Sequence, residues 1–152
     1  MSLESYVITK QEQGLQVLEW LRGELVYLRH EAGISLKSIP NRKCRIVNLA
    51  MVAHLNQFYP DVCAIGLRAP NTRNQIFYEG IKLEHVVGYC FNTELNLHFV
   101  FDGTADQILG VGNGIQICHA STFKDSVQRM NNVLGINITQ QIIGPQSYSP
   151  LY

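Results

Sequence analysis

The sequence lacks a net charge, a long apolar run and a recognisable targeting segment. Its 12 lysines and arginines balance its 12 aspartates and glutamates, so the formal net charge is zero. A nucleic-acid-binding domain, or a protein that binds an anionic membrane, usually carries a basic excess. No stretch approaches the roughly 18 apolar residues of a membrane span, and no basic segment followed by an apolar run opens the chain. We therefore expect neither a nucleic-acid partner nor a membrane partner.

The sequence also lacks the paired cysteine spacing of redox and structural zinc sites. Its cysteines, Cys44, Cys63, Cys90 and Cys118, are widely separated and form no Cys-x-x-Cys motif. A chain of 152 residues is long enough to bury a core without disulfides. We expect one domain over 1–152 with reduced thiols, no metal and no cofactor. We also expect a cytoplasmic location, or delivery to a host cytosol without a classical signal peptide. A zinc site made of Cys63, Cys90, Cys118 and a histidine is the alternative.

Leucine periodicity predicts a long first helix. Leucines recur at steps of three and four residues, as on one face of a helix, at Leu15, Leu18, Leu21, Leu25 and Leu28. Thr9 and Glu12 have the spacing of a capping box, and Gly33 is a typical helix stop. The helix is therefore predicted to run from about residue 10 to residue 31.

A second helix is predicted to begin near Cys44, with Asn41 as its N-cap and Pro60 as its end. After Pro60 the apolar period changes toward two, which is typical of strands. Segments enriched in Val, Ile, Phe and Tyr predict strands at 61–67, 75–83, 85–91, 97–101 and 114–120.

The C-terminal part is predicted to form another helix and a short strand. Thr122 and Asp125 have capping-box spacing at the start of a helical pattern that ends at Gly135. Residues 136–143 are compatible with a last strand, and 144–152 is predicted to be a loose tail. This element order predicts the α+β class, with N-terminal helices packed on an antiparallel sheet.

His85 and Asp102 are predicted to face each other across a β-hairpin. They lie in two apolar runs joined by the polar residues 92–94. A register that pairs Phe91 with Asn96 also pairs His85 with Asp102. Directly opposed residues of antiparallel strands project to the same face, with Cβ atoms about 4.5–5.5 Å apart. Asp102 would then accept a hydrogen bond from one imidazole nitrogen and leave the other free.

Cys44 would complete a Cys-His-Asp triad. A helix N-terminus stabilises a thiolate through its free N–H groups and its dipole, and Arg42 and Lys43 add positive potential. His85 would take the thiol proton, and Asp102 would fix the tautomer of the imidazole. The backbone N–H of Cys44 is a candidate donor in an oxyanion hole.

Each of these residues also has a purely structural interpretation. Cys44 would serve equally as a buried apolar residue, since free cysteine is among the most buried residue types. His85 and Asp102 would then form a structural pair. His98 lies on the same strand and face as Asp102, and it is the alternative base if the hairpin register is different.

Three segments of the chain resemble the transglutaminase-like branch of the papain-like cysteine hydrolases. The segments are Asn41-Arg42-Lys43-Cys44, Glu84-His85-Val86-Val87 and Asp102-Gly103-Thr104-Ala105-Asp106-Gln107. The last resembles the family's Asp-x-Thr-Ala-Asp-Gln run, whereas Lys43 and Arg45 differ from the small residues that often flank the family's cysteine. The resemblance implies a papain-like/transglutaminase-like core with Cys44, His85 and Asp102 as the catalytic residues.

The sequence favours a thiol-dependent hydrolase that acts on amide bonds through a Cys44 thioester. The substrate would be a protein or peptide, attacked at a glutamine side-chain amide or an isopeptide bond, because the chain is short and has no obvious second lobe. Two alternatives remain. One is a catalytically silent α+β protein-binding module, and the other is an arylamine acyltransferase-like enzyme with the same triad. The oligomeric state is not indicated.

Overall fold

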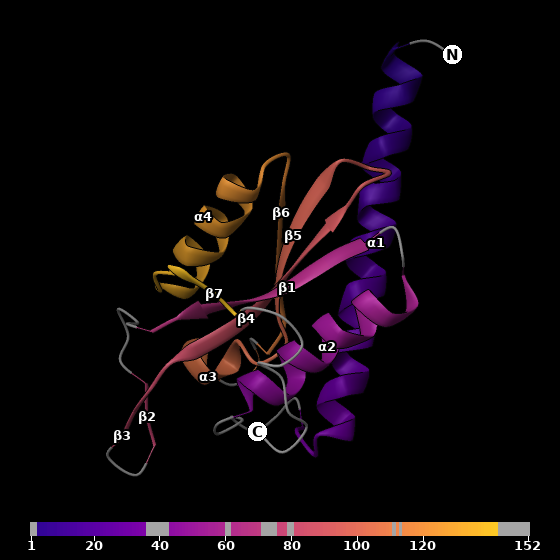
Figure 1. The fold of residues 1–152 in the computed structure, drawn as a ribbon. Coiled ribbons are helices and arrows are strands. Elements are labelled where there is room, and N and C mark those ends of the chain that lie inside the picture. Colours follow the sequence, from indigo (N-terminus) through magenta and orange to yellow (C-terminus); the bar gives the residue numbers. More distant parts are fainter. Residues whose placement is uncertain are drawn as a thin grey trace.

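The computed structural model describes residues 3–35, 43–59, 62–70, 76–78, 81–110, 112 and 114–142. In this part of the chain the elements follow in the order α1 (Leu3–Glu31), α2 (Cys44–Phe58), β1 (Val62–Ala69), β2 (Ile76–Tyr78), β3 (Ile81–Leu83), β4 (His85–Asn92), β5 (Leu97–Asp102), α3 (Asp106–Leu109), β6 (Gln116–Ala120), α4 (Phe123–Leu134) and β7 (Gln140–Ile142). N-terminal helices pack on a five-stranded antiparallel sheet, so the predicted α+β class is confirmed (Figure 1). The predicted tail, 144–152, lies outside the described residues.

The sheet has the strand order β6-β5-β4-β1-β7, which places β4 at its centre. Strand β1 pairs with β4 along its whole length, from Val62 opposite Asn92 to Ala69 opposite His85. Strand β5 pairs with β4 on the other side and then with β6. Because β4 and β5 are antiparallel, the first residue of β4 and the last residue of β5 lie at the same end of the sheet.

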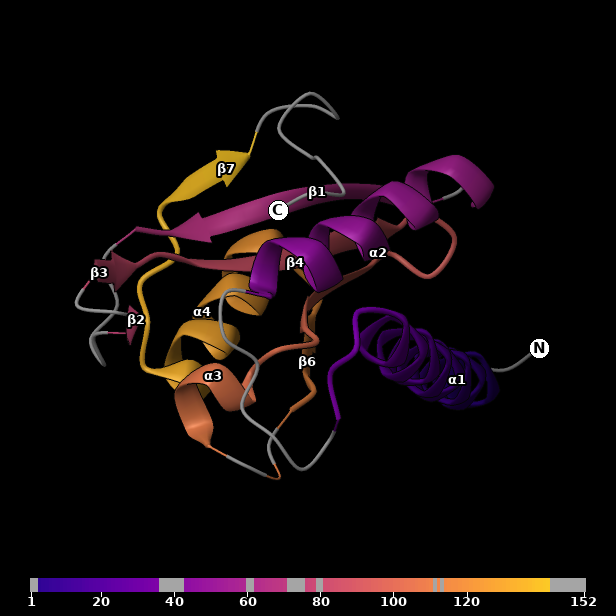
Figure 2. The ribbon, with the colours of Figure 1, turned by 90° about the horizontal axis from the view of Figure 1, so that it is seen from below.

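Side chains on the two faces of the sheet build two separate cores. On one face, Cys90, Phe99 and Phe101 pack against leucines of α1 and α2. On the other face, residues such as Tyr89 and Val100 pack against α4. The alternation follows from the period of two along each strand. Figures 1 and 2 accordingly show α2 and α4 on opposite sides of the sheet, with α1 beside α2.

Helix α1 begins earlier than the sequence suggested. It starts at Leu3, so Thr9 lies inside the helix and the predicted capping box is wrong. The physical reason is that no glycine or proline interrupts residues 3–13, so the helical pattern continues toward the N-terminus. The predicted stop is confirmed, because Gly33 has the positive φ of 74° that favours glycine after a helix.

The start of α2 and the strand predicted at 75–83 also need correction. The N-cap of α2 is Lys43, which makes no side-chain capping bond, so the predicted cap at Asn41 is wrong. The strand predicted at 75–83 is divided into β2 and β3, which pair with each other outside the main sheet. The strand prediction took no account of the glycine at position 80, a residue type that often interrupts a strand pattern.

The capping of α4 follows the prediction. The Thr122 hydroxyl accepts a hydrogen bond from the backbone N–H of Asp125 at 3.1 Å. At the other end, Gly135 adopts the left-handed conformation that terminates the helix. Local sequence signals were sufficient here because both contacts join residues close together in the chain.

Replacing Gly88 with alanine should destabilise the fold. A Cβ at this position would lie 2.1 Å from the Phe101 ring, which is fully buried and directly opposed across the β4–β5 pair. Overpacking of this kind typically costs about 1–3 kcal/mol. The matched control is Gly23→Ala in α1, where no atom lies within 4 Å of the added Cβ. That change should stabilise the helix by about 0.5–1 kcal/mol. Urea unfolding of both variants measures the difference, and equal stabilities would contradict the packing described.

Candidate active site

Cys44, His85 and Asp102 each occupy an end of a secondary-structure element. Cys44 is the first residue of α2, His85 is the first of β4 and Asp102 is the last of β5. All three are buried, with 6%, 0% and 0% of their surfaces exposed. The predicted placements of these residues at element ends are therefore confirmed, and the fold brings the three elements together at one end of the sheet.

His85 and Asp102 form a direct side-chain contact. The His85 Nε2 and the Asp102 Oδ2 are 2.6 Å apart, within a buried environment. This distance is that of a short, charge-assisted hydrogen bond. The predicted hydrogen bond between the two residues is confirmed.

The hairpin register that led to this prediction is wrong by two residues. Phe91 pairs with His98, not with Asn96, and Asn92 pairs with Leu97. His85 and Asp102 are therefore diagonal neighbours, not directly opposed ones. The contact survives because side chains alternate faces with a period of two, so a shift of two residues returns each side chain to its original face.

The loop between β4 and β5 accounts for the register. Its turn spans residues 93–96, one position further along the chain than the sequence suggested. The Asn92 side-chain oxygen accepts a hydrogen bond from the backbone N–H of Leu95 at 2.9 Å. Asn96 has a positive φ of 54°, a conformation in which asparagine is enriched. The residues of this turn are of types that favour turns, but they are compatible with several loop lengths. The sequence therefore did not specify the register.

The environment of His85 and Asp102 favours the ionised form of both. Burial acts to lower the pKa of His85, but the charge and hydrogen bond of Asp102, with a smaller effect of Cys44, raise it to about 10. Burial acts to raise the pKa of Asp102, but the charge and hydrogen bond of His85 and the bonds from Asn48 and Thr104 lower it below its usual value. The two side chains therefore form an imidazolium–carboxylate pair at neutral pH.

The second nitrogen of His85 is left for Cys44. His85 Nδ1 is buried, and no donor or acceptor meets full hydrogen-bond geometry with it among the residues described. The Cys44 thiol is nevertheless close enough to raise the pKa of the imidazole. The ring thus has a carboxylate on Nε2 and a thiol close enough to act on it, which is the combination needed for proton exchange with Cys44.

Asn48 connects all three elements of the site, and sequence reasoning missed it. It lies one turn after Cys44 on α2, and its Nδ2 donates to Asp102 Oδ1 at 2.9 Å and to the Val86 carbonyl at 2.8 Å. Its Oδ1 accepts from the Gly103 N–H at 2.8 Å. The available signal was a polar residue at helical spacing from Cys44 on one side and from the apolar Met51 and Leu55 on the other.

The segment after Asp102 is fixed by bonds from Thr104 and from Arg29. The Thr104 N–H and hydroxyl both donate to Asp102 Oδ1, at 2.8 and 3.1 Å. Asp106 accepts bonds from both terminal nitrogens of Arg29, at 2.9 and 2.8 Å, and Arg29 also donates to the Gly103 carbonyl. Arg29 and Asp106 are both buried. The conspicuous Thr-Ala-Asp run after Asp102 therefore supports the carboxylate and anchors it to α1.

The other candidate residues are not brought into this site. His98 bonds to the Tyr89 hydroxyl at 2.6 Å and stacks on Phe91, so it does not replace His85 as the partner of Asp102. Cys63 is exposed and Cys90 is buried in the core; both thiols are free, like those of Cys44 and Cys118. In the described ranges, no three His, Cys, Asp or Glu side chains are grouped so as to hold a metal ion.

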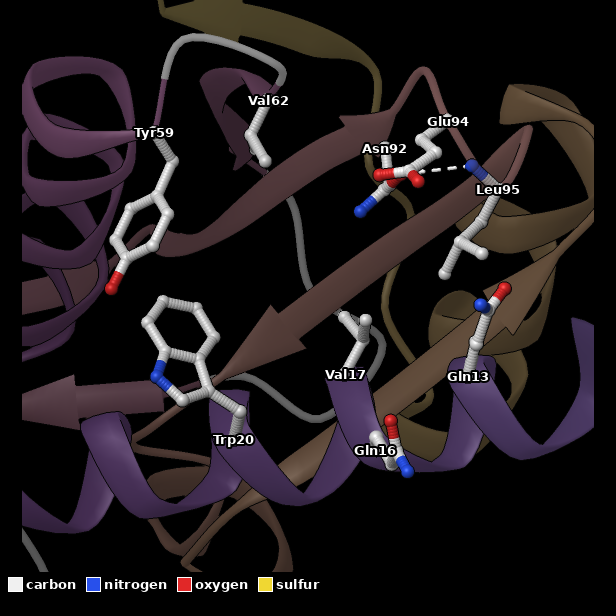
Figure 3. Close-up of a pocket in the computed structure, with 9 residues that line it drawn as sticks. All are labelled: Gln13, Gln16, Val17, Trp20, Tyr59, Val62, Asn92, Glu94 and Leu95. Carbon is white, nitrogen blue, oxygen red and sulfur yellow. Dashed lines mark hydrogen bonds between the residues drawn. The ribbon is translucent and has the colours of Figure 1, made fainter.

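A separate groove is lined by residues of α1, the end of α2 and the strands beside them (Figure 3). It has a volume of about 390 Å³ and is lined by Gln13, Gln16, Val17, Trp20, Tyr59, Val62, Asn92, Glu94 and Leu95. Val62 begins β1 and Asn92 ends β4, whereas His85 begins β4. The groove is therefore at the opposite end of the sheet from the candidate site and contributes no residue to it.

Comparison with known proteins leaves the site to be interpreted from its own geometry. No family model, no curated protein and no solved structure matches the chain. Among the helices that the structure describes, none is both long and apolar enough to cross a membrane.

The stability of the protein should depend on pH through His85. The pKa of His85 is 6.5 in an unfolded chain and about 10 in the folded protein. Its contribution to the unfolding free energy is therefore complete below pH 6.5 and is lost as the pH rises toward 10. In that interval the folded state binds one more proton, so the unfolding free energy should fall by up to about 1.4 kcal/mol per pH unit. Asp102 behaves oppositely: its contribution is present above pH 3.8 and is lost as the pH falls further.

Urea unfolding at pH 7, 8 and 9 would measure this slope in the wild type and in Asp102→Asn. The variant removes the charge that raises the pKa of His85, so most of the slope should disappear. Parallel curves for the two proteins would contradict the ion pair. If Asp102→Asn does not fold, NMR titration of the His85 ring in the wild type gives the same information.

Replacing Asn48 with leucine should lower stability by at least about 2 kcal/mol, because it leaves the buried Val86 carbonyl and Gly103 N–H without their partner. The matched control is Asn56→Leu on the same helix. Asn56 also bonds a backbone N–H and carbonyl, both of Ala64, but it is exposed, so water can replace its bonds. Equal losses in denaturant unfolding would show that burial does not set the cost.

Proposed function

We propose that the protein is a thiol-dependent hydrolase of amide bonds, with Cys44 as nucleophile, His85 as general base and acid, and Asp102 as the group that orients the imidazole. The observation that carries the proposal is the two-sided environment of His85. Asp102 occupies Nε2 at 2.6 Å, while the Cys44 thiol, at a helix N-terminus, acts on the same ring. A structural histidine needs only the first of these contacts.

The first half of the reaction starts from the form in which the proton of the Cys44 thiol lies on His85 Nδ1, so that a thiolate faces the imidazolium that Asp102 stabilises. The sulfur then attacks the amide carbonyl carbon, so that a C–S bond forms and the carbonyl oxygen becomes an oxyanion. The first N–H groups of α2 have no partner within the helix, and the N–H of Cys44 would donate to this oxyanion. His85 returns the proton to the leaving nitrogen as the C–N bond breaks, which releases ammonia or an amine and leaves a thioester on Cys44.

In the second half, water hydrolyses the thioester. His85 takes a proton from the water, the resulting hydroxide attacks the thioester carbonyl, and the C–S bond breaks to release a carboxylic acid and restore the Cys44 thiol. Asp102 stays ionised throughout and stabilises the imidazolium that forms in each half. Covalent catalysis of this kind needs no metal and no cofactor.

The proposed substrate is a protein or peptide presenting a slender side-chain amide. Only 6% of Cys44 is exposed, so a main-chain amide flanked by bulky side chains reaches the sulfur less easily than the end of a flexible glutamine or isopeptide-linked side chain. The resemblance of the three site segments supports a papain-like/transglutaminase-like core, in which a cysteine on a helix meets a histidine and an aspartate on antiparallel strands.

A catalytically silent protein-binding module is the second candidate. The burial of Cys44 and the complete burial of His85 and Asp102 favour it, because a silent module needs no access for a substrate. The two candidates differ in what the thiol does. In a silent module the Cys44 sulfur is inert packing, and neither Cys44 nor His85 affects the turnover of any amide.

Two substitutions, Cys44→Ala and His85→Gln, test the proposal. Activity would be measured as ammonia release from glutamine-containing proteins and as cleavage of isopeptide-linked substrates. Each change should abolish nearly all activity, and the double variant should add little, because members of a catalytic unit act non-additively. Cys63→Ala is the matched control, since this thiol is exposed and lies opposite Phe91, toward the other end of β4 from His85, and it should leave activity unchanged.

Circular dichroism would verify that each variant is folded. Inertness of the folded wild-type protein across a broad panel of amides would favour the silent module. Activity that persists in Cys44→Ala would disprove the assignment of the nucleophile.

A further inference from the structure

Three charged side chains link the elements that carry Cys44 and His85. The Arg45 Nη2 donates to Glu84 Oε1 at 2.5 Å, and the Arg68 Nε donates to Glu84 Oε2. Arg68 also donates through Nη1 to the Gln140 side chain at 2.9 Å. We call Arg45, Glu84 and Arg68 the charged cluster. It connects α2, the start of β4, strand β1 and, through Gln140, strand β7.

Two residues of the charged cluster are direct sequence neighbours of the proposed catalytic residues. Arg45 directly follows Cys44, and Glu84 directly precedes His85. The Arg45–Glu84 ion pair therefore joins the residue next to the proposed nucleophile to the residue next to the proposed base. Arg68 adds a third support, because β1 runs beside β4 and places Ala69 opposite His85.

The first turn of α2 is also held by apolar packing, in which Cys44 lies in one buried cluster with Leu49 and Val86. The N-cap Lys43 makes no side-chain capping bond. Asn48 holds the helix one turn further on, through Val86 and Asp102. Core packing of Val47, Met51 and Leu55 and the bonds of Asn56 to Ala64 hold the body of α2 on the sheet. The Arg45–Glu84 pair adds a polar attachment in the first turn, next to the Cys44 sulfur.

The charges and the solvent exposure of the cluster suit a local restraint on the first turn of α2. Glu84 stays ionised, because Arg45 and Arg68 together overcome the effect of burial and lower its pKa. Side-chain exposures of 27%, 25% and 40% for Arg45, Glu84 and Arg68 mean that water screens the charges. Ion pairs of this exposure contribute little to global stability, so the cluster is better suited to setting local geometry than to holding the fold together.

We propose that Arg45 and Glu84, supported by Arg68, are positioning residues that hold the Cys44 sulfur against His85 Nδ1. This inference rests on the proposed function, since it assigns the cluster to the same thiol–imidazole pair. It also explains the arginine after Cys44, where the family that the sequence resembles often has a small residue. The cluster would act through geometry and would touch neither the substrate nor the reacting atoms.

The test is the pH profile of Cys44 alkylation by iodoacetamide, measured by mass spectrometry from pH 5 to pH 9, which needs no knowledge of the substrate. In the wild type, the positive charge of the His85 imidazolium beside the sulfur should favour the thiolate and allow labelling already near pH 6, and His85→Gln should remove this low-pH reactivity. Glu84→Gln and Arg45→Gln should slow labelling at pH 6 by about 10- to 100-fold, since small displacements of reacting groups have effects of that size. At pH 9, where hydroxide generates the thiolate, both variants should match the wild type.

Two further variants separate positioning from a general structural role. Arg45→Lys keeps the cation and should restore part of the reactivity at pH 6. Glu24→Gln is the matched control, because it breaks another partly exposed contact of α2, the 3.6 Å contact between Glu24 and His54. This control should leave the whole profile unchanged. Thermal unfolding midpoints should be similar for all these variants.

The outcomes distinguish the two proposals. If wild-type Cys44 shows no labelling at pH 6 that depends on His85, the proposed function fails and the positioning role fails with it. If that labelling is present but survives in both Glu84→Gln and Arg45→Gln, only the positioning role is overturned. A uniform slowing at every pH, accompanied by a lower unfolding midpoint, would also overturn it in favour of simple structural support.

Discussion

The burial of the Asp102 carboxylate is the constraint on which the rest of the site depends. A buried charge is tolerable only when an opposite charge and hydrogen bonds compensate for the water it has lost. Asp102 meets this requirement with His85 on one oxygen and with Asn48 and Thr104 on the other. Asp102 therefore keeps His85 protonated and also holds β5, the turn after it and α2 in one arrangement.

The need to compensate buried polar groups extends from Asp102 to residues further from the site. The side-chain amide of Asn48 forms hydrogen bonds with Asp102, Val86 and Gly103. The carbonyl of Gly103 is in turn bonded to Arg29, whose charge Asp106 neutralises. A series of hydrogen-bonded, buried polar groups thus reaches from the sheet to α1. Such a network fixes one geometry because a partial rearrangement would leave a buried group without a partner.

Local features of the fold could be predicted from the sequence, and long-range ones could not. The ends of α4 depend on Thr122 and Gly135, whose partners are a few residues away. The positions of Cys44, His85 and Asp102 at element ends were equally visible, because periodicity changes where an element begins or ends. Asn48 and Arg29 bond to residues more than 35 positions away, and no sequence period specifies which buried polar groups will meet. The catalytic roles themselves stay predictions.

The two-residue displacement of the β4–β5 register shows which changes of strand pairing the site tolerates. A slip of two residues leaves His85 and Asp102 on the same face of the sheet, whereas a slip of one residue would turn them to opposite faces. A longer hairpin loop does not by itself cause such a slip, because loops of different lengths can join strands that keep the same pairing. The pairing of β4 with β5, and not the number of residues between the histidine and the aspartate, therefore decides whether the two side chains can meet, and a search for relatives that demands one fixed spacing would miss chains with the same site.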